Sequence, residues 1–305
     1  MGGIAEVTPV IPSVSLAAAA GVPVWLKAEC LQVTGSFKVR GAANALTLLS
    51  ERGAVPGVVA VSSGNHGRAV AHVARSLGIQ AVICLSERVP AHKRDAIADL
   101  GARVVVAGPT QETAEAEARR LMDAEGLVFV HPFDDPAVIA GQATVGLEIL
   151  VQVPDARCVV VPLSGGGLIA GIGLAVEPDE SGVRLFGASQ DRGPAMHDSL
   201  RAGRLVDVVE EDTLADALAG GLGEENHYTF ELCRQLVEDV VLVSEDEMAE
   251  AIRLLHRDHD LKVEGGGAVG VAAVMAGRLP LDGPTVVVVS GGNIGDAEWE
   301  RVLHA

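Results

Sequence analysis

CVVVPLSGGGLIAGIGLAVE, residues 158–177, passes from a β-branched run through four small residues into a segment with helical spacing. A continuous apolar run without alternation is typical of a strand covered on both faces of a parallel sheet. Three consecutive glycines let the backbone approach a ligand closely, and the helix that follows aims its first N–H groups at it. The stretch predicts a parallel α/β fold with an anion-binding loop at the carboxyl end of one strand.

The same strand–loop–helix unit recurs on both sides of this stretch. Apolar runs that alternate with helical segments lie at 57–64, 81–85, 102–108, 127–130, 183–189 and 285–292, and another such unit lies at 239–258. We therefore predict two doubly wound parallel sheets with an active site in the cleft between them. The predicted domains are a large discontinuous one over 1–56 and 135–305 and a small one over 57–134.

Composition excludes several classes of partner. Lys and Arg number 23 and Asp and Glu 41, so the chain carries −18 and repels nucleic acid and anionic membrane surfaces. Only 3% of residues are aromatic, and no apolar run is long enough to span a bilayer. The N-terminus lacks the basic region of a signal peptide. Four scattered cysteines without metal spacing predict reduced thiols in a cytoplasmic protein: Cys30, Cys84, Cys158 and Cys233.

A second candidate loop is SSGNHG, residues 62–67, which follows the run VVAV and opens a helix. Its side chains supply hydrogen-bonding groups, its glycines permit close backbone approach, and the helix N-terminus favours an anion. The structural alternative is an ordinary N-cap in which Ser63 or Asn65 satisfies the first N–H groups. Two serines, two glycines, an asparagine and a histidine are more than a cap requires, so we favour a binding loop.

The glycine loop at 164–168 leaves two ligands open. It suits a single phosphate, but residues 165–170 also fit the G-x-G-x-x-A pattern of a dinucleotide fold, with Asp191 near the place of a ribose-binding acid. A structural alternative is that the glycines only permit tight helix–sheet packing.

Two further loops follow later in the chain. SGGN, residues 290–293, ends an apolar run where a turn needs only one glycine, so Ser290 suggests a hydroxyl aimed at a ligand ring. KVEGGGAVG, residues 262–270, places Glu264 before another glycine nest, and a tightly packed helix start explains that segment equally well.

In this order, these loops resemble those of the fold-type II pyridoxal-phosphate enzymes, specifically the threonine/serine dehydratase and serine racemase group. The resemblance extends over nearly the whole chain, through TGSFKVRGA, SSGNHGRA, HPFDDPAVIAGQATVGLE, PLSGGGLIAG, VEGGGAVG and SGGN. The segments at 191–204 and 213–230 most resemble the dehydratase branch of hydroxyectoine breakdown. The resemblance implies a tryptophan synthase β-like fold, pyridoxal 5′-phosphate in the large domain, a mobile small domain for the substrate, and a homodimer or higher homo-oligomer.

The resemblance also implies the roles of individual residues. Lys38 forms the internal Schiff base and, once the substrate amine displaces it, moves the Cα proton; a neutral amine is needed for both, and desolvation favours one. Ser63 is placed to act as acid or base on the opposite face. The implied cofactor-binding residues are Phe37, Lys38, Asn65, Ser164, Gly165, Gly166, Gly167, Leu168, Glu264 and Ser290. The implied substrate-binding residues are Ser62, Ser63, Gly64, Asn65 and His66.

The implied reaction is β-elimination from a 3-hydroxy amino acid such as L-threonine or L-serine, which gives a 2-oxo acid and ammonia. The alternatives are a hydroxyectoine-breakdown dehydratase that acts on a larger hydroxy amino acid, and serine racemase. An NAD-dependent oxidoreductase would leave Lys38 and SSGNHG unexplained, and an intact Lys38 argues against a non-catalytic binding protein.

The chain departs from its relatives in three places. Acidic residues that help some racemases bind a divalent cation correspond here to Ala188 and Pro194, so we expect no metal. We also expect no regulatory domain after Ala305 and a leading helix that is mostly missing.

Overall fold

A computed structural model describes residues 3–53, 55–177, 182–223 and 225–304. The chain forms two compact units. Unit 1 comprises Met1–Glu6, Gln32–Thr34 and Lys38–Gly141, and unit 2 comprises Val7–Leu31, Gly35–Phe37 and Gln142–Ala305. The predicted domains also assign roles, cofactor binding to the large domain and substrate binding with mobility to the small one. These roles stay a prediction.

Unit 1 is built on a parallel sheet in the order β5-β4-β3-β6. Its strands are β3 (Val58–Val61), β4 (Ala81–Leu85), β5 (Arg103–Val106) and β6 (Val128–Phe129). Its helices are α2 (Lys38–Glu51), α3 (Asn65–Leu77), α4 (Ala91–Asp99), α5 (Gln111–Glu125) and the first residues of α6 (Pro136–Gln152).

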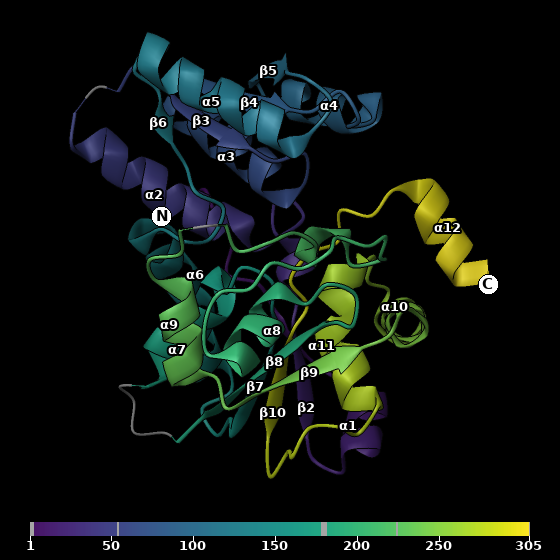
Figure 1. The fold of residues 1–305 in the computed structure, drawn as a ribbon. Coiled ribbons are helices and arrows are strands. Elements are labelled where there is room, and N and C mark those ends of the chain that lie inside the picture. The colour runs from purple at the N-terminus through teal and green to yellow at the C-terminus, as the bar shows by residue number, and fades with distance from the viewer. Residues whose placement is uncertain (1–2, 54, 178–181, 224, 305) are drawn as a thin grey trace. The chain divides into compact units, whose positions relative to one another are not determined.

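Side chains alternate across this sheet, and those of the central strands β3 and β4 are buried on both faces. Val58 and Ile83 pack in one cluster with α2 and α3, whereas Val59 and Val82 pack in another with α5. Helices α3 and α5 accordingly cover opposite faces of the sheet (Figure 1). Burial on both faces explains why β3 and β4 are continuous apolar runs.

Unit 2 contains a sheet in the order β1-β2-β10-β7-β8-β9. Its strands are β1 (Val10–Pro12), β2 (Val24–Lys27), β7 (Cys158–Pro162), β8 (Arg184–Gln190), β9 (Asp239–Val243) and β10 (Thr285–Val288). All neighbours are parallel except β1 and β2. Its helices are α1 (Val14–Ala20), most of α6, α7 (Gly167–Val176), α8 (Ala195–Ala202), α9 (Thr229–Leu236), α10 (Glu245–His259), α11 (Gly265–Met275) and α12 (Asp296–His304), with single 3₁₀ turns η1 (Glu29–Leu31) and η3 (Asp216–Leu218).

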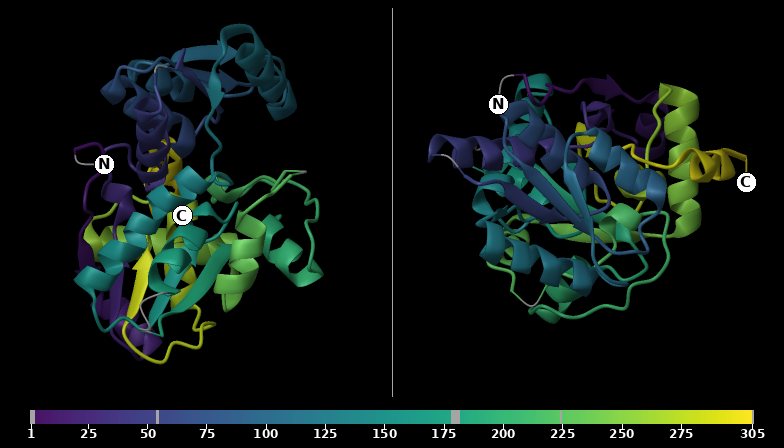
Figure 2. Two further views of the ribbon diagram at one scale, coloured as in Figure 1. Left: turned by 90° about the vertical axis from the view of Figure 1, so that its left-hand side faces the viewer. Right: turned by 90° about the horizontal axis from the view of Figure 1, so that it is seen from above.

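Two cores cover the faces of this second sheet. Val160 and Phe186 pack with α10 and α11, whereas Val159 and Leu185 pack with α6 and α7. α12, the last helix, lies beside α10 (Figures 1 and 2).

The predicted α/β class with two parallel sheets is confirmed. Strands β1 and β2 were not predicted, because β1 has only three residues and ends in Pro12, and the apolar run of β2 ends in the charged Lys27. Within the described ranges, no helix combines the length and apolar character needed to cross a membrane. The described residues also contain no group of three His, Cys, Asp or Glu side chains able to hold a metal ion.

Candidate active site

The loop SSGNHG follows β3 and leads directly into α3, as predicted. Gly64 is the N-cap residue of α3, and no side chain caps this end. The N-cap position is therefore occupied by Gly64 and not by Ser63 or Asn65. By contrast, α5 and α10 both begin with complete capping boxes. An uncapped N-terminus leaves N–H groups and the positive end of the helix dipole for an anion.

Packing fixes the shape of this loop. A Cβ at Gly67 would lie 2.2 Å from the Ser62 carbonyl oxygen, so only glycine fits there. The Ser62 hydroxyl accepts a hydrogen bond from Gly64 N at 3.3 Å. Ser62 and Ser63 are half-buried, whereas Asn65 is buried. The loop therefore holds two serine hydroxyls beside an open helix end.

Lys38 is the first residue of α2. The residue as a whole is half-buried, but protein atoms surround its amine, and this desolvation lowers the pKa of Lys38 to about 8. Its Nζ donates to the carbonyl oxygen of Pro132 at 2.7 Å. At pH 7.5, roughly a quarter of such amines are neutral, compared with about one in a thousand at the ordinary value. A substantial fraction of the amine therefore has the neutral, nucleophilic form that the predicted Schiff base needs.

His66 lies close to Lys38 in unit 1. It is buried, and its Nε2 is 2.8 Å from the Val130 carbonyl oxygen, so Nε2 carries the proton and donates. Desolvation, followed by the charge of Lys38, lowers the pKa of His66 to about 3. His66 is therefore a neutral hydrogen-bond donor rather than a general acid near neutral pH.

The sequence analysis missed one residue of this region, His131. Its Nδ1 accepts hydrogen bonds from Phe133 N at 3.2 Å and from Asp134 N at 2.7 Å. His131 stands first in the HPFDDPAVIAGQATVGLE motif, to which the analysis gave no side-chain role. The available signal was a histidine two residues after a strand and directly before a proline.

In unit 2, the glycine loop follows β7 and opens α7, as predicted. Gly166 is the N-cap of α7 in the left-handed conformation, with φ 87°, and no side chain caps the helix. Ser164 is half-buried, whereas Gly165, Gly167 and Leu168 are buried. This end of α7 presents backbone N–H groups alone, as an anion nest does.

Helices α8 and α9 pack directly against this loop. A Cβ at Gly166 would lie 2.8 Å from Cys233 Sγ, 2.9 Å from Met196 Cε and 3.1 Å from Thr229 Cβ. Further along α7, a Cβ at Gly173 would lie 3.0 Å from Leu236 Cδ1. Tight packing is therefore present at this loop, but at Gly166 it is packing against helices and not the helix–sheet packing of the structural alternative.

The SGGN loop at the end of β10 holds the segment just before Lys38. Phe37 N donates to the Ser290 carbonyl at 3.1 Å, Gly292 N donates to the Gly35 carbonyl at 2.9 Å, and Ser36 forms an antiparallel bridge with Gly291. Gly35, at φ 76°, packs against Asn293, since a Cβ there would lie 2.5 Å from Asn293 Oδ1. Residues 35–37 are thus fixed to the carboxyl end of β10, and Phe37 is half-buried.

Ser290 and Glu264 lie together at the start of α11. Ser290 is buried, with its Oγ 3.5 Å from the Gly266 carbonyl, and Glu264 N donates to the Gly291 carbonyl at 3.2 Å. A Cβ at Gly267 would lie 2.4 Å from the Gly291 carbonyl oxygen, which confirms the tightly packed helix start. Because β10 and β7 are parallel neighbours, this loop and the glycine loop lie at one edge of the sheet.

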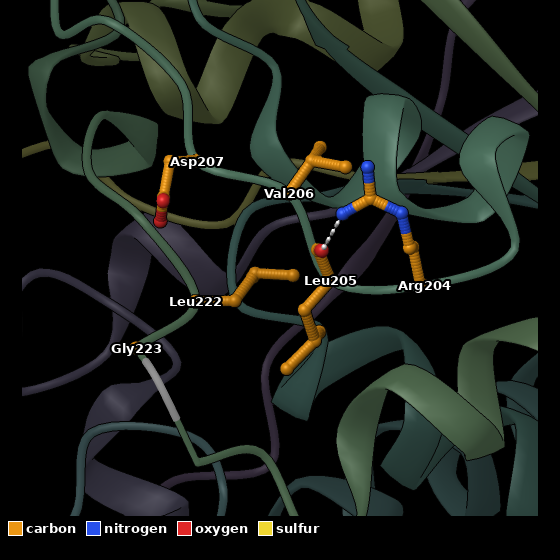
Figure 3. A pocket seen from close by; sticks show the side chains of 6 residues that line it. All are labelled: Arg204, Leu205, Val206, Asp207, Leu222 and Gly223. Atoms are coloured by element: carbon orange, nitrogen blue, oxygen red, sulfur yellow. Dashed lines mark hydrogen bonds between the residues drawn. The ribbon is translucent and has the colours of Figure 1, made fainter.

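A surface hollow of about 540 Å³ lies elsewhere in unit 2 (Figure 3). Its lining comes from Arg204, Leu205, Val206, Asp207, Leu222 and Gly223. The Arg204 guanidinium donates to the carbonyl of Leu205 at 3.3 Å, and Leu222 also belongs to the core beside Leu168. None of the predicted site residues lines this hollow, so it is not the candidate active site.

Known proteins match this chain over almost its full length. A protein of Sinorhizobium fredii, provisionally named threonine dehydratase, is 48% identical over 97% of this chain and 90% of its own. An L-threonine ammonia-lyase of Geobacter sulfurreducens is 44% identical over 90% of this chain and 68% of its own. The structure of maize serine racemase superposes with a TM-score of 0.92 at 32% identity, covering 98% of this chain and 92% of that one.

The family described as "Pyridoxal-phosphate dependent enzyme" matches residues 3–291. This range contains Lys38, both uncapped helix N-termini and the SGGN strand end as far as Gly291. The chain therefore belongs to the pyridoxal-phosphate-dependent enzyme family.

Proposed function

We propose that this protein is an ammonia-lyase that eliminates water from a 3-hydroxy amino acid, with pyridoxal 5′-phosphate attached to Lys38. The observation that carries the proposal is the amine of Lys38, which is desolvated and has a pKa lowered to about 8. In addition, the residues just before Lys38 are fixed by hydrogen bonds to the end of β10. An ordinary surface lysine has none of these properties.

The residues present fit the cofactor. The family assignment favours a single phosphate over a dinucleotide, and the uncapped glycine end of α7 suits one phosphate group. Ser290, buried at the end of β10, would meet the pyridine nitrogen, and Phe37 would pack beside the ring. Asn65 would hold the ring hydroxyl, and Glu264 completes the cofactor set. When bound, the cofactor supplies an electron sink for the pair left at Cα.

The chain's own residues bind the substrate and move its protons. The uncapped end of α3, with Ser62, Ser63 and Gly64, would bind the α-carboxylate. Neutral His66 would hold this loop through its bond to Val130. Lys38, once released, would take the Cα proton, and Ser63 would act on the opposite face.

Relatives support the leaving group and the substrate class. Proteins named L-threonine ammonia-lyase, from Geobacter sulfurreducens and Thermotoga maritima, are 44% and 43% identical to this chain. We therefore propose L-threonine and L-serine as substrates, with a 2-oxo acid and ammonia as products.

An ammonia-release assay tests this function. L-threonine, L-serine, a longer 3-hydroxy amino acid, and O-acetyl-L-serine with sulfide are compared in parallel. Release from a hydroxy amino acid, and its loss in Lys38→Ala, are the expected results. Reaction of the O-acetyl-L-serine pair alone would identify a β-replacement synthase, and preference for the longer substrate would favour the hydroxyectoine branch.

Serine racemisation is the second candidate, since the maize serine racemase structure superposes with a TM-score of 0.92. A racemase needs an acid on the face opposite Lys38, which is the proposed position of Ser63. Chiral chromatography after incubation with L-serine separates the two activities. Racemisation should depend on the Ser63 hydroxyl more strongly than elimination does.

We also propose that the protein acts as a homo-oligomer in the cytoplasm. All four cysteines are buried and free, as suits a reducing compartment. Val7 and Val151 are 71% and 79% exposed, and the residues that follow them are joined by a hydrogen bond from Gln152 Nε2 to the Thr8 carbonyl at 3.0 Å. A second copy would cover this apolar surface. Light scattering on wild type and Val151→Lys tests the assignment, because the variant should shift towards a monomer.

A further inference from the structure

We propose that His131 is a positioning residue for Lys38. Its ring holds the 130–134 turn (Val130–Asp134) in the shape that presents the Pro132 carbonyl to the lysine amine. The role bears on catalysis only if Lys38 carries the cofactor as proposed above, but the positioning itself is a property of the chain.

The first step is the hydrogen bonding of the turn. His131 Nδ1 accepts from the N–H groups of Phe133 and Asp134, at 3.2 and 2.7 Å. An aspartate or asparagine side chain closes turns in this way, whereas a histidine rarely does. Both bonds need a bare Nδ1, so the ring proton is on Nε2.

The second step is the fixed orientation of the ring. The rings of Phe129 and Phe133 meet the His131 ring edge-on, with centroids 6.1 and 4.7 Å away. Aromatic pairs at these separations favour such T-shaped contacts. The orientation of the His131 ring, and with it the direction of Nδ1, is therefore held by two aromatic contacts.

The third step is the acceptor for Lys38. In the sequence, Pro132 lies between His131 and the two residues whose N–H groups the His131 ring binds. The carbonyl of Pro132 accepts a hydrogen bond from Lys38 Nζ at 2.7 Å. A buried amine loses the hydrogen bonds of water, so a fixed carbonyl both satisfies it and sets its direction. Loss of the His131 acceptor would free the turn and remove that direction.

The groups that surround the amine make its pKa a usable readout. His66, on α3, is neutral near pH 7 and donates to Val130, at the start of the same turn. The pKa of Lys38 is lowered to about 8 by desolvation. If the carbonyl moves away while the site stays dry, the ammonium form loses a partner, and the pKa of Lys38 must fall further.

The experiment measures this pKa in the cofactor-stripped, full-length chain. Competitive acetylation with acetic anhydride, from about pH 6 to about pH 10, is read at Lys38 by peptide mass spectrometry, with exposed Lys262 as internal reference. The variants are His131→Phe, which keeps an aromatic ring but has no acceptor, and His131→Asn, whose Oδ1 can replace Nδ1. His92→Phe, at an exposed position on α4, is the matched control. Hydrogen exchange at the Phe133 and Asp134 amides is measured in parallel.

We expect His131→Phe to lower the pKa of Lys38 by about one unit and to speed exchange at both amides by roughly tenfold. His131→Asn and His92→Phe should keep the wild-type values. An unchanged pKa in folded His131→Phe would overturn the proposal, and so would a rise towards the ordinary value, since the ring would then act by excluding water. If His131→Phe does not fold, His131→Asn decides the question. A shifted pKa of Lys38 in that variant, while slow amide exchange shows that the turn is intact, would also overturn the proposal. Failure of the ammonia-release assay would refute the proposed function without changing these results.

Discussion

The N-termini of α3 and α7 both leave backbone N–H groups open to an anion, but they differ in what surrounds them. Both lack a side-chain cap, and both begin with a glycine as N-cap. At α3, a Cβ on Gly64 would meet no atom within 4 Å, and serine, asparagine and histidine side chains surround the helix end. At α7, a Cβ on Gly166 would meet three side chains within 3.1 Å, and the loop presents backbone alone.

The difference separates two meanings of glycine in a binding loop. At Gly166, glycine is required by a left-handed backbone in a crowded place. At Gly64, neither condition holds, since φ is −111° and the space is open. The helix end of α7 is therefore rigid and suits an invariant group such as a phosphate. At α3, the space beside Gly64 is open, as a substrate site needs, whereas Gly67 fixes the loop from its other side.

The sharpest way to break this comparison is to add one methyl group at each loop. Gly166→Ala should reduce the free energy of unfolding by about 2–4 kcal/mol, from the left-handed backbone together with overpacking. It should also weaken cofactor binding by at least roughly tenfold. Gly64→Ala should cost less than about 1 kcal/mol. Urea unfolding and titration of the cofactor absorbance measure both, and equal losses at the two sites would refute the comparison.

The charge of Lys38 should make unit 1 sensitive to alkaline pH. Its folded pKa of about 8 is below the ordinary 10.5, so the unfolded chain binds more protons between these values and stability rises with pH across that window. The destabilisation is fully present below pH 8. Cofactor-free Lys38→Met should therefore be more stable than wild type at pH 7 by about 2–3 kcal/mol.

Urea unfolding across the alkaline range checks this prediction, and the advantage of Lys38→Met should vanish above the ordinary pKa. An advantage that is independent of pH would assign the effect to packing rather than to charge.

Below pH 6.5, the loss of stability with falling pH should come mainly from His66. Its folded pKa of about 3 is below the ordinary 6.5, so stability falls as pH drops from 6.5 towards 3. The slope from this one group should approach about 1.4 kcal/mol per pH unit. His66→Gln retains a donor for Val130 and should flatten this limb, as followed by thermal unfolding between these pH values. His72→Gln, at a half-buried position on α3, serves as the control and should change the limb less.

Crowding at Gly166 can be tested by making room. Cys233→Ala removes the Sγ that lies 2.8 Å from the added methyl. Gly166→Ala should then cost about 0.5–1 kcal/mol less in the Cys233→Ala background than in wild type. A double-mutant cycle in urea measures this coupling. Additive costs would show that the left-handed backbone alone excludes alanine.

The smallest effect concerns Asp260, the described non-glycine residue with positive φ, at 53°. It is the C-cap of α10, where an acidic side chain also opposes the helix dipole. Asp260→Gly should stabilise the protein by up to about 1 kcal/mol, and Asp260→Ala should not. Thermal unfolding compares the two. A gain at Asp260 beside a large loss at Gly166 would show that crowding, more than the sign of φ, decides which positions need glycine.

Features set by neighbouring residues could be predicted from the sequence, and features set by distant contacts could not. Apolar runs followed by glycine loops gave β3, β7, their helices and the two uncapped N-termini, because each depends on a few consecutive residues. The pairing of residues 35–37 with 290–292 joins segments about 250 positions apart, and no local pattern encodes it. His131 was missed for another reason, since it takes the part of an asparagine in closing a turn.

That pairing has a consequence for biosynthesis. β10 lies between β2 and β7 in the sheet, although it follows both in the chain. At about 5–20 residues per second, the ribosome needs roughly 10–50 s to pass from Lys38 to the SGGN loop. During that interval the strand edges that β10 will cover are unpaired, and exposed edges promote aggregation. The segment before Lys38 can thus reach its folded position only after β10 and the SGGN loop have been synthesised, and the yield of active protein in cells should depend on chaperone supply.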